Sequence, residues 1–156
     1  MVKQSAGILL YRLKKHGPEV FLVHPGGPFW SKKDAGVWSI PKGEIDDKEE
    51  ALKVAFREFK EETGYELEGD FKPLRPIKQK SGKIVYAWAG EGDVDETKIT
   101  SNSFEIEWPP KSGKMKSFPE VDRAGWFHFN EAKEKINPGQ LPLLEELMDF
   151  LQWKKQ

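Results

Sequence analysis

Runs of apolar and β-branched residues predict a sheet built from several short strands. Residues 6–13 and 19–24 form two such runs, and the segment between them contains Gly17 and Pro18, which favour a turn. These two runs therefore predict a β-hairpin. Further strands are predicted at residues 37–41, 83–90, 99–108 and 123–129.

Apolar residues recur at helical spacing after the predicted strand at 37–41. The positions on this apolar stripe are Leu52, Ala55, Phe56 and Phe59. They predict a helix over residues 48–62. Asp47 is the expected N-cap, Glu50 completes a capping box, and Thr63–Gly64 ends the helix.

Two more helices are predicted near the C-terminus. Residues 130–136 predict a short helix capped by Asn130, and residues 141–153 repeat leucine and methionine at helical intervals. The segments 24–36 and 109–120 are rich in glycine and proline, so we expect loops there.

The order of these elements indicates the fold class. Strands and helices are interleaved, but several neighbouring strands are joined by hairpins, which predicts an α/β fold with helices packed on a mixed sheet. A length of 156 residues fits one domain with a sizeable core, so residues 1–156 are expected to form a single domain.

Composition narrows the possible partners. The chain carries 25 basic and 26 acidic residues, and its net charge of −1 argues against bulk attraction to nucleic acid or an anionic membrane. It has no cysteine, which excludes disulfides and thiolate metal sites and fits a reducing compartment. No apolar run is long enough for a signal peptide or a membrane span. We therefore expect a cytoplasmic protein, with monomer and homodimer both left open.

The end of the predicted helix 48–62 carries a group of carboxylates. Glu58, Glu61 and Glu62 lie at i, i+3 and i+4, so they share one face with neighbouring Cβ atoms about 5–6 Å apart. Acidic side chains near a helix C-terminus oppose the helix dipole and repel one another. One interpretation is a solvated acidic face, and the other is a bound divalent cation that neutralises these charges. Oxygen ligands favour Mg²⁺ or Mn²⁺, and Mg²⁺ commonly shares its coordination with substrate phosphates.

Residues 43–65 resemble the Nudix box. That motif has Gly, Glu, Arg-Glu, Glu-Glu and Gly at fixed spacing, with apolar residues at two further places. This chain fills those positions with Gly43, Glu49, Arg57, Glu58, Phe59, Glu61, Glu62, Gly64 and Tyr65. Phe59 and Tyr65 are larger than the aliphatic residues common there. The resemblance implies an α/β/α sandwich around a mixed sheet, and hydrolysis of a nucleoside diphosphate linked to another moiety, with Mg²⁺ or Mn²⁺ as cofactor.

The resemblance also implies roles for individual residues of the motif. The residues at its metal-ligand positions are Glu58, Glu61 and Glu62. Arg57 is expected to hold a glutamate in place through a charge-assisted hydrogen bond, with Glu49 in support. Gly43 and Gly64 are expected to have backbone roles only, in a turn and at the helix stop.

Other segments are similar to the diadenosine polyphosphate hydrolases of the same superfamily. The similarity lies in residues 38–44, 84–90 and 119–127. It implies that Glu120 approaches the metal and takes part in catalysis. Glu105 and Glu107 are rival candidates, because their predicted strand could face the same site. Glu62 and Glu120 are both left open as the general base.

Several residues are candidates for binding the substrate. Lys42 follows a proline in a turn beside the carboxylate helix, where its charge suits a phosphate. Lys80 belongs to a second basic cluster with Lys78 and Lys83. The aromatic candidates for the site edge or for stacking on a base are Trp38, Tyr86, Trp88, Phe29 and Trp30. Burial in the core is the alternative for each aromatic residue, and a solvated surface is the alternative for the lysines.

The preferred hypothesis is a metal-dependent hydrolase of dinucleoside polyphosphates such as diadenosine tetraphosphate. One alternative is a pyrophosphohydrolase acting on nucleoside triphosphates or RNA 5′ ends. Another is a non-catalytic nucleotide-sensing domain, against which the complete motif argues. Residues 24–36 and 107–120 are the segments expected to set specificity, and the base and the phosphorus attacked are left open.

Overall fold

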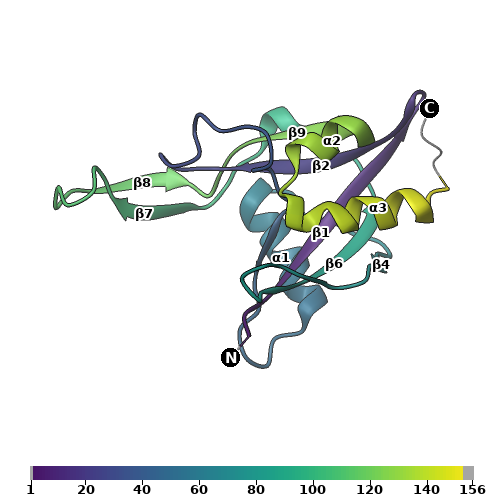
Figure 1. Ribbon diagram of the computed structural model, residues 1–156, viewed down its shortest axis with the longest axis horizontal. Helices are drawn as coiled ribbons and strands as arrows, with labels where there is room; N and C mark the ends of the chain where they lie inside the picture. The colour runs from purple at the N-terminus through teal and green to yellow at the C-terminus, as the bar shows by residue number, and fades with distance from the viewer. Residues whose placement is uncertain (1, 153–156) are drawn as a thin grey trace.

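A long antiparallel hairpin forms the centre of the fold in the computed structural model, which describes residues 2–152 (Figure 1). Strand β1 spans Gln4–Lys14 and β2 spans Gly17–Pro25, with Lys14 paired to Gly17 across the turn. Gly17 has a φ of +116°, a conformation that side chains other than glycine rarely adopt. The predicted hairpin is therefore confirmed, with strands longer than the sequence indicated.

The hairpin is extended on both sides into a mixed sheet. Strand β6 (Ile84–Glu91) runs parallel to β1, whereas β9 (Val121–His128) is antiparallel to β2. Three short strands complete the seven-stranded sheet, namely β3 (Lys42–Glu44), β4 (Lys72–Pro73) and β5 (Ile77–Lys78). The predicted mixed sheet is confirmed.

Helices cover both faces of this sheet. Helix α1 (Ala51–Thr63) packs on one face, and helices α2 (Phe129–Lys135) and α3 (Leu141–Phe150) pack on the other (Figure 1). Two single-turn 3₁₀ helices also occur, η1 (Glu96–Lys98) and η2 (Pro138–Gln140). Two apolar cores result, and the fold is the expected α/β/α sandwich.

The alternation of side chains along β1 explains why there are two cores. Ile8 and Leu10 belong to the core under α1, whereas Leu9 and Tyr11 belong to the core under α2 and α3. Successive side chains of a strand point to opposite faces, so a strand that is covered on both sides is apolar at every position. Residues 5–11 are accordingly all buried.

A second, two-stranded sheet projects from the body of the fold. Strands β7 (Ser103–Glu107) and β8 (Met115–Pro119) pair in antiparallel register, and Figure 1 shows them extending away from the helices as an arm. The prediction that residues 109–120 form only a loop is therefore wrong. Alternation was a poor guide there, because most of β8 is exposed and its sequence has little apolar pattern.

The segment before α1 differs from the sequence prediction in two ways. Residues 37–41 form two isolated bridges, Val23 with Ser39 and Trp38 with Ile136, and the regular strand follows at Lys42–Glu44. The predicted strand at 37–41 is thus wrong. Ser39 pairs with Val23 and Trp38 pairs with Ile136, so the segment forms no continuous ladder with either neighbour.

The start of α1 also lies later than predicted. The N-cap is Glu50, without a side-chain cap, and Lys48 has a φ of +70°, which interrupts any helix beginning at 48. The capping box of Asp47 and Glu50 is therefore wrong. The predicted end is confirmed, because Gly64 adopts a left-handed φ of +84° and its N–H bonds to the carbonyl of Lys60.

The C-terminal helices agree with the sequence prediction in place and type. The cap of α2 is His128 and not the expected Asn130. Helix α3 ends at Phe150, and Trp153, the last residue of the predicted helix, lies outside the described residues. Within residues 2–152, none of the helices combines the length and apolar character needed to cross a membrane.

Truncating Leu147 to alanine should lower the free energy of unfolding by about 2–5 kcal/mol, because this side chain is fully buried between α3 and the sheet. Phe150→Ala is the matched control on the same helix, since Phe150 is 42% exposed, and it should cost much less. Urea denaturation followed by circular dichroism measures both values. Equal costs would contradict the placement of α3 over the second core.

Candidate active site

The last two turns of α1 bring the predicted carboxylates together on one side of the helix. Phe59 is fully buried and packs against Phe21, with ring centroids 5.6 Å apart, which fixes the rotation of the helix on the sheet. Glu58, Glu61 and Glu62 consequently lie toward β3 and toward Glu120, which immediately precedes β9.

Gly43 in β3 allows α1 to approach the sheet closely. A Cβ atom at this position would lie 1.9 Å from Oε1 of Glu58, so any larger residue would displace that carboxylate. Glu62 contacts the residue before Gly43 in β3, because its carboxylate accepts a hydrogen bond from the backbone N–H of Lys42. Two of the three carboxylates are thus held against the backbone of β3.

The carboxylates are crowded enough to disturb their protonation. The pKa of Glu62, which is only 8% exposed, rises to about 9, mainly through burial and then through the charges of Glu58 and Glu120. The pKa of Glu58 rises to about 7 through burial and through its hydrogen bond and repulsion with Glu61. Burial and the charge of Glu61 also raise the pKa of Glu120. Four acidic groups therefore share one electrostatic environment.

Arg57 and Glu49 form an ion pair beside this group. Nη1 of Arg57 donates to Glu49 Oε2, while Nη2 lies 3.8 Å from Glu58 Oε2. The positive charge of Arg57 works against the rise in the Glu58 pKa. Glu49 also accepts a hydrogen bond of 2.8 Å from the backbone N–H of Asp46. Glu49 thereby links Arg57 to the turn that precedes α1.

A cavity of about 220 Å³ opens next to the buried carboxylate. Its walls come from β2, the segment before β3, α1 and the start of β9, and its lining residues are Val23, Pro25, Ser39, Ile40, Lys42, Glu62, Glu120 and Val121. Burial and the nearby charge of Lys83 lower the pKa of Lys42, while Glu62 opposes that change. The cavity is thus lined by two carboxyl groups, of Glu62 and Glu120, and by the amine of Lys42, whose pKa is lowered.

The donor set of this site fits a hard divalent cation. Glu58, Glu61, Glu62 and Glu120 supply only oxygen atoms, and a cation would offset the repulsion that, together with burial, raises the pKa values of Glu58, Glu62 and Glu120. The absence of a Cβ at Gly43 provides the room that Glu58 occupies. As they stand, no three acidic or histidine side chains among residues 2–152 already form a metal-binding group.

The other predicted site residues are placed differently. Trp38 lies in the core at 5% exposure, and its Nε1 donates to Asp34. Tyr86 lies on β6, where its hydroxyl accepts a hydrogen bond from Gln4. Lys80 lies in the turn before β6, outside the lining of the cavity. Lys83 of the same cluster, rather than Lys80, is the lysine whose charge reaches Lys42, and the sequence held no signal to choose between them.

The two rivals of Glu120 lie on the projecting arm. Glu105 is exposed on β7, and the carboxylate of Glu107 accepts hydrogen bonds from the backbone N–H groups of Lys111 and Gly113 at the tip. Neither lines the cavity, whereas Glu120 does. The geometry therefore favours Glu120 among the three.

Comparison with known proteins places the chain among one set of relatives. A family model described as the NUDIX domain matches residues 1–147. The asymmetrical bis(5′-nucleosyl)-tetraphosphatase of Rattus norvegicus is 40% identical over 79 residues, which cover 46% of this chain and 54% of that protein. The matched segment thus spans about half the length of that relative.

Solved structures share the fold over almost the whole chain. A binary complex of a C. elegans Ap4A hydrolase has a TM-score of 0.67 at 21% identity and covers 95% of this chain and 98% of its own. The NUDIX domain of Shewanella oneidensis NrtR, complexed with ADP ribose, has a TM-score of 0.65 at 16% identity and covers 97% and 89%. At these identities the similarity shows a common fold.

The free energy of unfolding of the metal-free protein should fall as the pH rises from about 5 to 8. The folded protein keeps a proton on Glu62 up to a pKa of about 9, whereas the unfolded chain releases it near the ordinary value of 4.5, so higher pH favours unfolding. Glu58 acts with the same sign up to its pKa of about 7. The lowered pKa of Lys42 acts in the opposite direction, between its folded pKa and the ordinary value of 10.5.

Urea denaturation in the presence of a chelator, at several pH values, measures this slope. Glu62→Gln should flatten it, whereas the control Glu66→Gln should not, because pairing with Lys60 lowers the pKa of that exposed carboxylate and places its effect below the window. Equal slopes for Glu62→Gln and the wild type would contradict the burial of an ionisable carboxyl at this site.

Proposed function

The chain belongs to the Nudix family, and we propose that it hydrolyses a phosphoanhydride bond in a nucleotide substrate in which a nucleoside diphosphate is linked to another moiety. A dinucleoside polyphosphate is the favoured substrate class. One observation carries the proposal: a cavity with Glu62 and Glu120 on its wall lies within electrostatic reach of Glu58 and Glu61, and Lys42 lines the same cavity.

The proposed cofactor is Mg²⁺ or Mn²⁺, because the donors are all carboxylate oxygens. The residues that would hold it are Glu58, Glu61, Glu62 and Glu120. When bound, such a cation stabilises charge on phosphate oxygens and lowers the pKa of water. Arg57, paired with Glu49, lies 3.8 Å from the carboxylate of Glu58 and would keep it oriented.

Residues of the cavity wall are proposed to accept a proton and to bind the phosphate. Glu62 and Glu120 both line the cavity, so either carboxylate is placed to accept the proton of an attacking water. Burial makes Glu62 the more basic of the two whenever its proton has been displaced. Lys42 supplies a positive charge to the phosphate from the same wall, and its partly desolvated amine makes that attraction stronger than it would be in water.

The choice of substrate class rests on the resemblance of residues 38–44 and on the curated relative. The rat protein is named as an asymmetrical bis(5′-nucleosyl)-tetraphosphatase, which acts on a dinucleoside polyphosphate. A pyrophosphohydrolase of nucleoside triphosphates or RNA 5′ ends is the second candidate, because the same cavity would accept any polyphosphate chain. A cytoplasmic location, and a monomer or a homodimer as the assembly, stay predictions.

Glu61→Gln and Glu62→Gln should each lower the rate of Mg²⁺-dependent hydrolysis of diadenosine tetraphosphate by roughly three decades or more, since each removes a negative charge from the proposed cation site. Glu105→Gln is the control, because this glutamate lies on the arm and should leave turnover near wild type. Circular dichroism checks that every variant is folded. Near wild-type turnover in either Glu61→Gln or Glu62→Gln would overturn the proposed site.

The substrate class is tested separately with a panel of nucleotides in ¹⁸O-labelled water. Diadenosine tetraphosphate should be hydrolysed with a higher kcat/KM than ATP or a 5′-triphosphorylated oligoribonucleotide, and the mass of the labelled product identifies the phosphorus attacked. A preference for the triphosphate or for the RNA would favour the second candidate, even if the cation site proves correct.

A further inference from the structure

Two segments that are far apart in the sequence pack together beside the candidate site. The segment 26–36, which follows β2, lies along the arm formed by β7 and β8 (Figure 1). The ring of Phe29 meets that of Trp108 edge-on, with centroids 5.3 Å apart and an interplanar angle of 80°. At Gly27 a Cβ would lie 2.9 Å from the ring of Phe104, so the segment rests directly on the arm.

This junction leaves aromatic rings exposed to solvent. Phe29 is 55% exposed and Trp30 is 40% exposed, and Trp108 is half-buried beneath Phe29. Nζ of Lys33 lies 5.3 Å from the centre of the Trp30 ring. We call Phe29, Trp30 and Trp108 the aromatic platform. Phe29 is in contact with Trp108 and Trp30 is its neighbour in the chain, so exposed rings gather at this junction, as they do at binding surfaces.

The platform is held in place by bonds at both ends of its segment. Buried His24 bonds through Nδ1 to Asp122, at 2.8 Å, and through Nε2 to the carbonyl of Lys33, at 2.6 Å. Further on, Asp34 accepts from Nε1 of Trp38 and pairs with Lys135. The rings therefore project from an anchored segment, so a ligand would meet a surface that is already formed, with a small entropic cost of ordering it.

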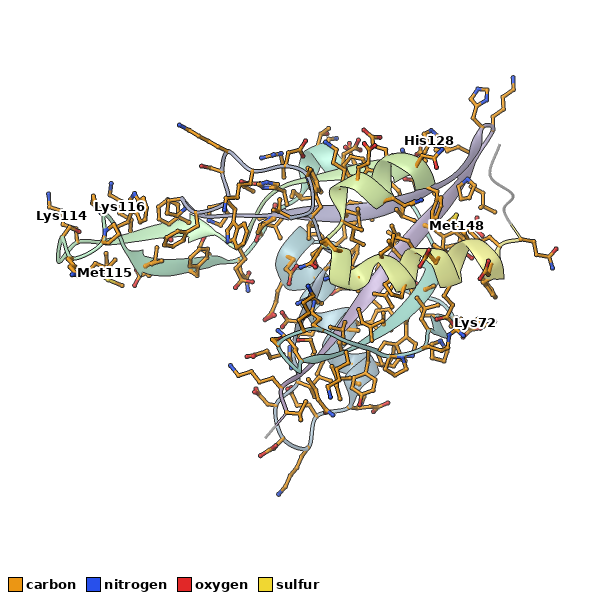
Figure 2. The ribbon with its side chains drawn as sticks, viewed as in Figure 1. Lys72, Lys114, Met115, Lys116, His128 and Met148 are labelled. Atoms are coloured by element: carbon orange, nitrogen blue, oxygen red, sulfur yellow. The ribbon has the colours of Figure 1, made fainter. Side chains whose placement is uncertain are left out.

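The side of the arm that bears the platform is basic. Phe104 pairs with Phe118 and Ile106 pairs with Lys116. The backbone N–H of Trp108 donates to the backbone carbonyl of Lys114. Paired residues of two antiparallel strands share a face, so Lys114 and Lys116 lie on the face of Trp108. Figure 2 shows these two lysines pointing to one side of the arm and Met115 to the other.

The acidic residues of the arm lie on its opposite face. Glu105 pairs with Ser117 and Glu107 pairs with Met115, so both strand positions alternate with those of the platform side. Asp34, the one acidic residue in the segment 26–36, is paired with Lys135. The platform thus combines exposed rings with lysines that have no acidic neighbour on the same face of the described strands, which suits a nucleobase attached to phosphate.

The platform lies close to the cavity along the chain. Pro25 lines the cavity, and Phe29 follows four residues later, so their Cα atoms are at most about 14 Å apart. The N–H of Gly26 bonds to the carbonyl of Glu120 at 2.9 Å, and a Cβ at Gly26 would lie 1.9 Å from the carbonyl oxygen of Pro119. The roots of the segment and of the arm are therefore locked together at Glu120 itself.

We propose that the aromatic platform binds the second nucleoside of a dinucleoside polyphosphate, whose phosphates occupy the cavity. The base stacks on Trp30, and the adjoining phosphate faces Lys33, Lys114 and Lys116. This inference rests on the proposed function, because it assumes that the polyphosphate chain lies at the cavity. It makes segment 26–36 and the arm one specificity element, and it explains how a substrate with two nucleosides would differ in affinity from one with a single nucleoside.

The test compares Trp30→Ala with wild type on two substrates that differ only in the second nucleoside, diadenosine tetraphosphate and adenosine 5′-tetraphosphate, both with Mg²⁺. Base–aromatic stacking corresponds to about a 5- to 150-fold effect. We expect kcat/KM for the dinucleotide to fall within that range, mainly through KM, with adenosine tetraphosphate changed less than about twofold. Phe150→Ala, an exposed aromatic residue on α3, is the matched control and should alter neither substrate.

The possible outcomes separate this inference from the function on which it rests. Equal effects of Trp30→Ala on the two substrates, or no effect on either, would overturn the platform while leaving the hydrolase intact. A loss confined to a 5′-triphosphorylated oligoribonucleotide would also overturn it, in favour of RNA. A wild-type protein that hydrolyses none of these substrates with Mg²⁺ or Mn²⁺ would instead overturn the proposed function. Thermal unfolding verifies that both variants remain folded.

Discussion

Mutual repulsion among four carboxylates around one small cavity is the constraint on which the structure of this site depends. Glu62 is nearly buried, and its pKa rises to about 9 because burial and its acidic neighbours both disfavour the charge. Such a site opposes folding unless protons or cations neutralise it. The scaffold tolerates it because Phe59 secures α1 to the sheet from the other side and because Gly43 lets the helix approach. The arrangement sacrifices stability for a function, as sites of this kind commonly do.

Chemistry and recognition are assigned to different parts of the fold. The carboxylates and Lys42 belong to α1, β3 and the start of β9, all within the sandwich. The exposed rings belong to the segment after β2 and to the arm, outside the two cores. Glu120 joins the two parts, since it lines the cavity and its carbonyl receives the N–H of Gly26. On the proposed function, changes in the arm should therefore alter substrate choice without disturbing the packing that holds the carboxylates.

Features set by local spacing were predictable from the sequence. The hairpin, the carboxylate face of α1 and the stop at Gly64 all follow from periodicity or from a single backbone conformation. Features that depend on tertiary contacts were not. The cap at Asp47 failed because Lys48 adopts a positive φ. Lys83, and not Lys80, affects the pKa of Lys42, because the fold of the turn before β6 decides which lysine of the cluster comes near it. Phe29 and Trp30 of the platform were already candidates for stacking from the sequence, whereas Trp108 was not, because only folding brings it against Phe29.

The central claim is tested most directly by calorimetric titration of the wild-type protein and of Glu62→Gln with Mn²⁺, in the absence of nucleotide. If the acidic face is built for a hard divalent cation, wild-type protein binds Mn²⁺ with measurable heat and a raised melting temperature. The variant, which lacks one of the proposed ligands, then binds at least tenfold more weakly, a loss of about 1.4 kcal/mol. Equal Mn²⁺ affinity in the two proteins, or the absence of binding to the wild type, would contradict the claim.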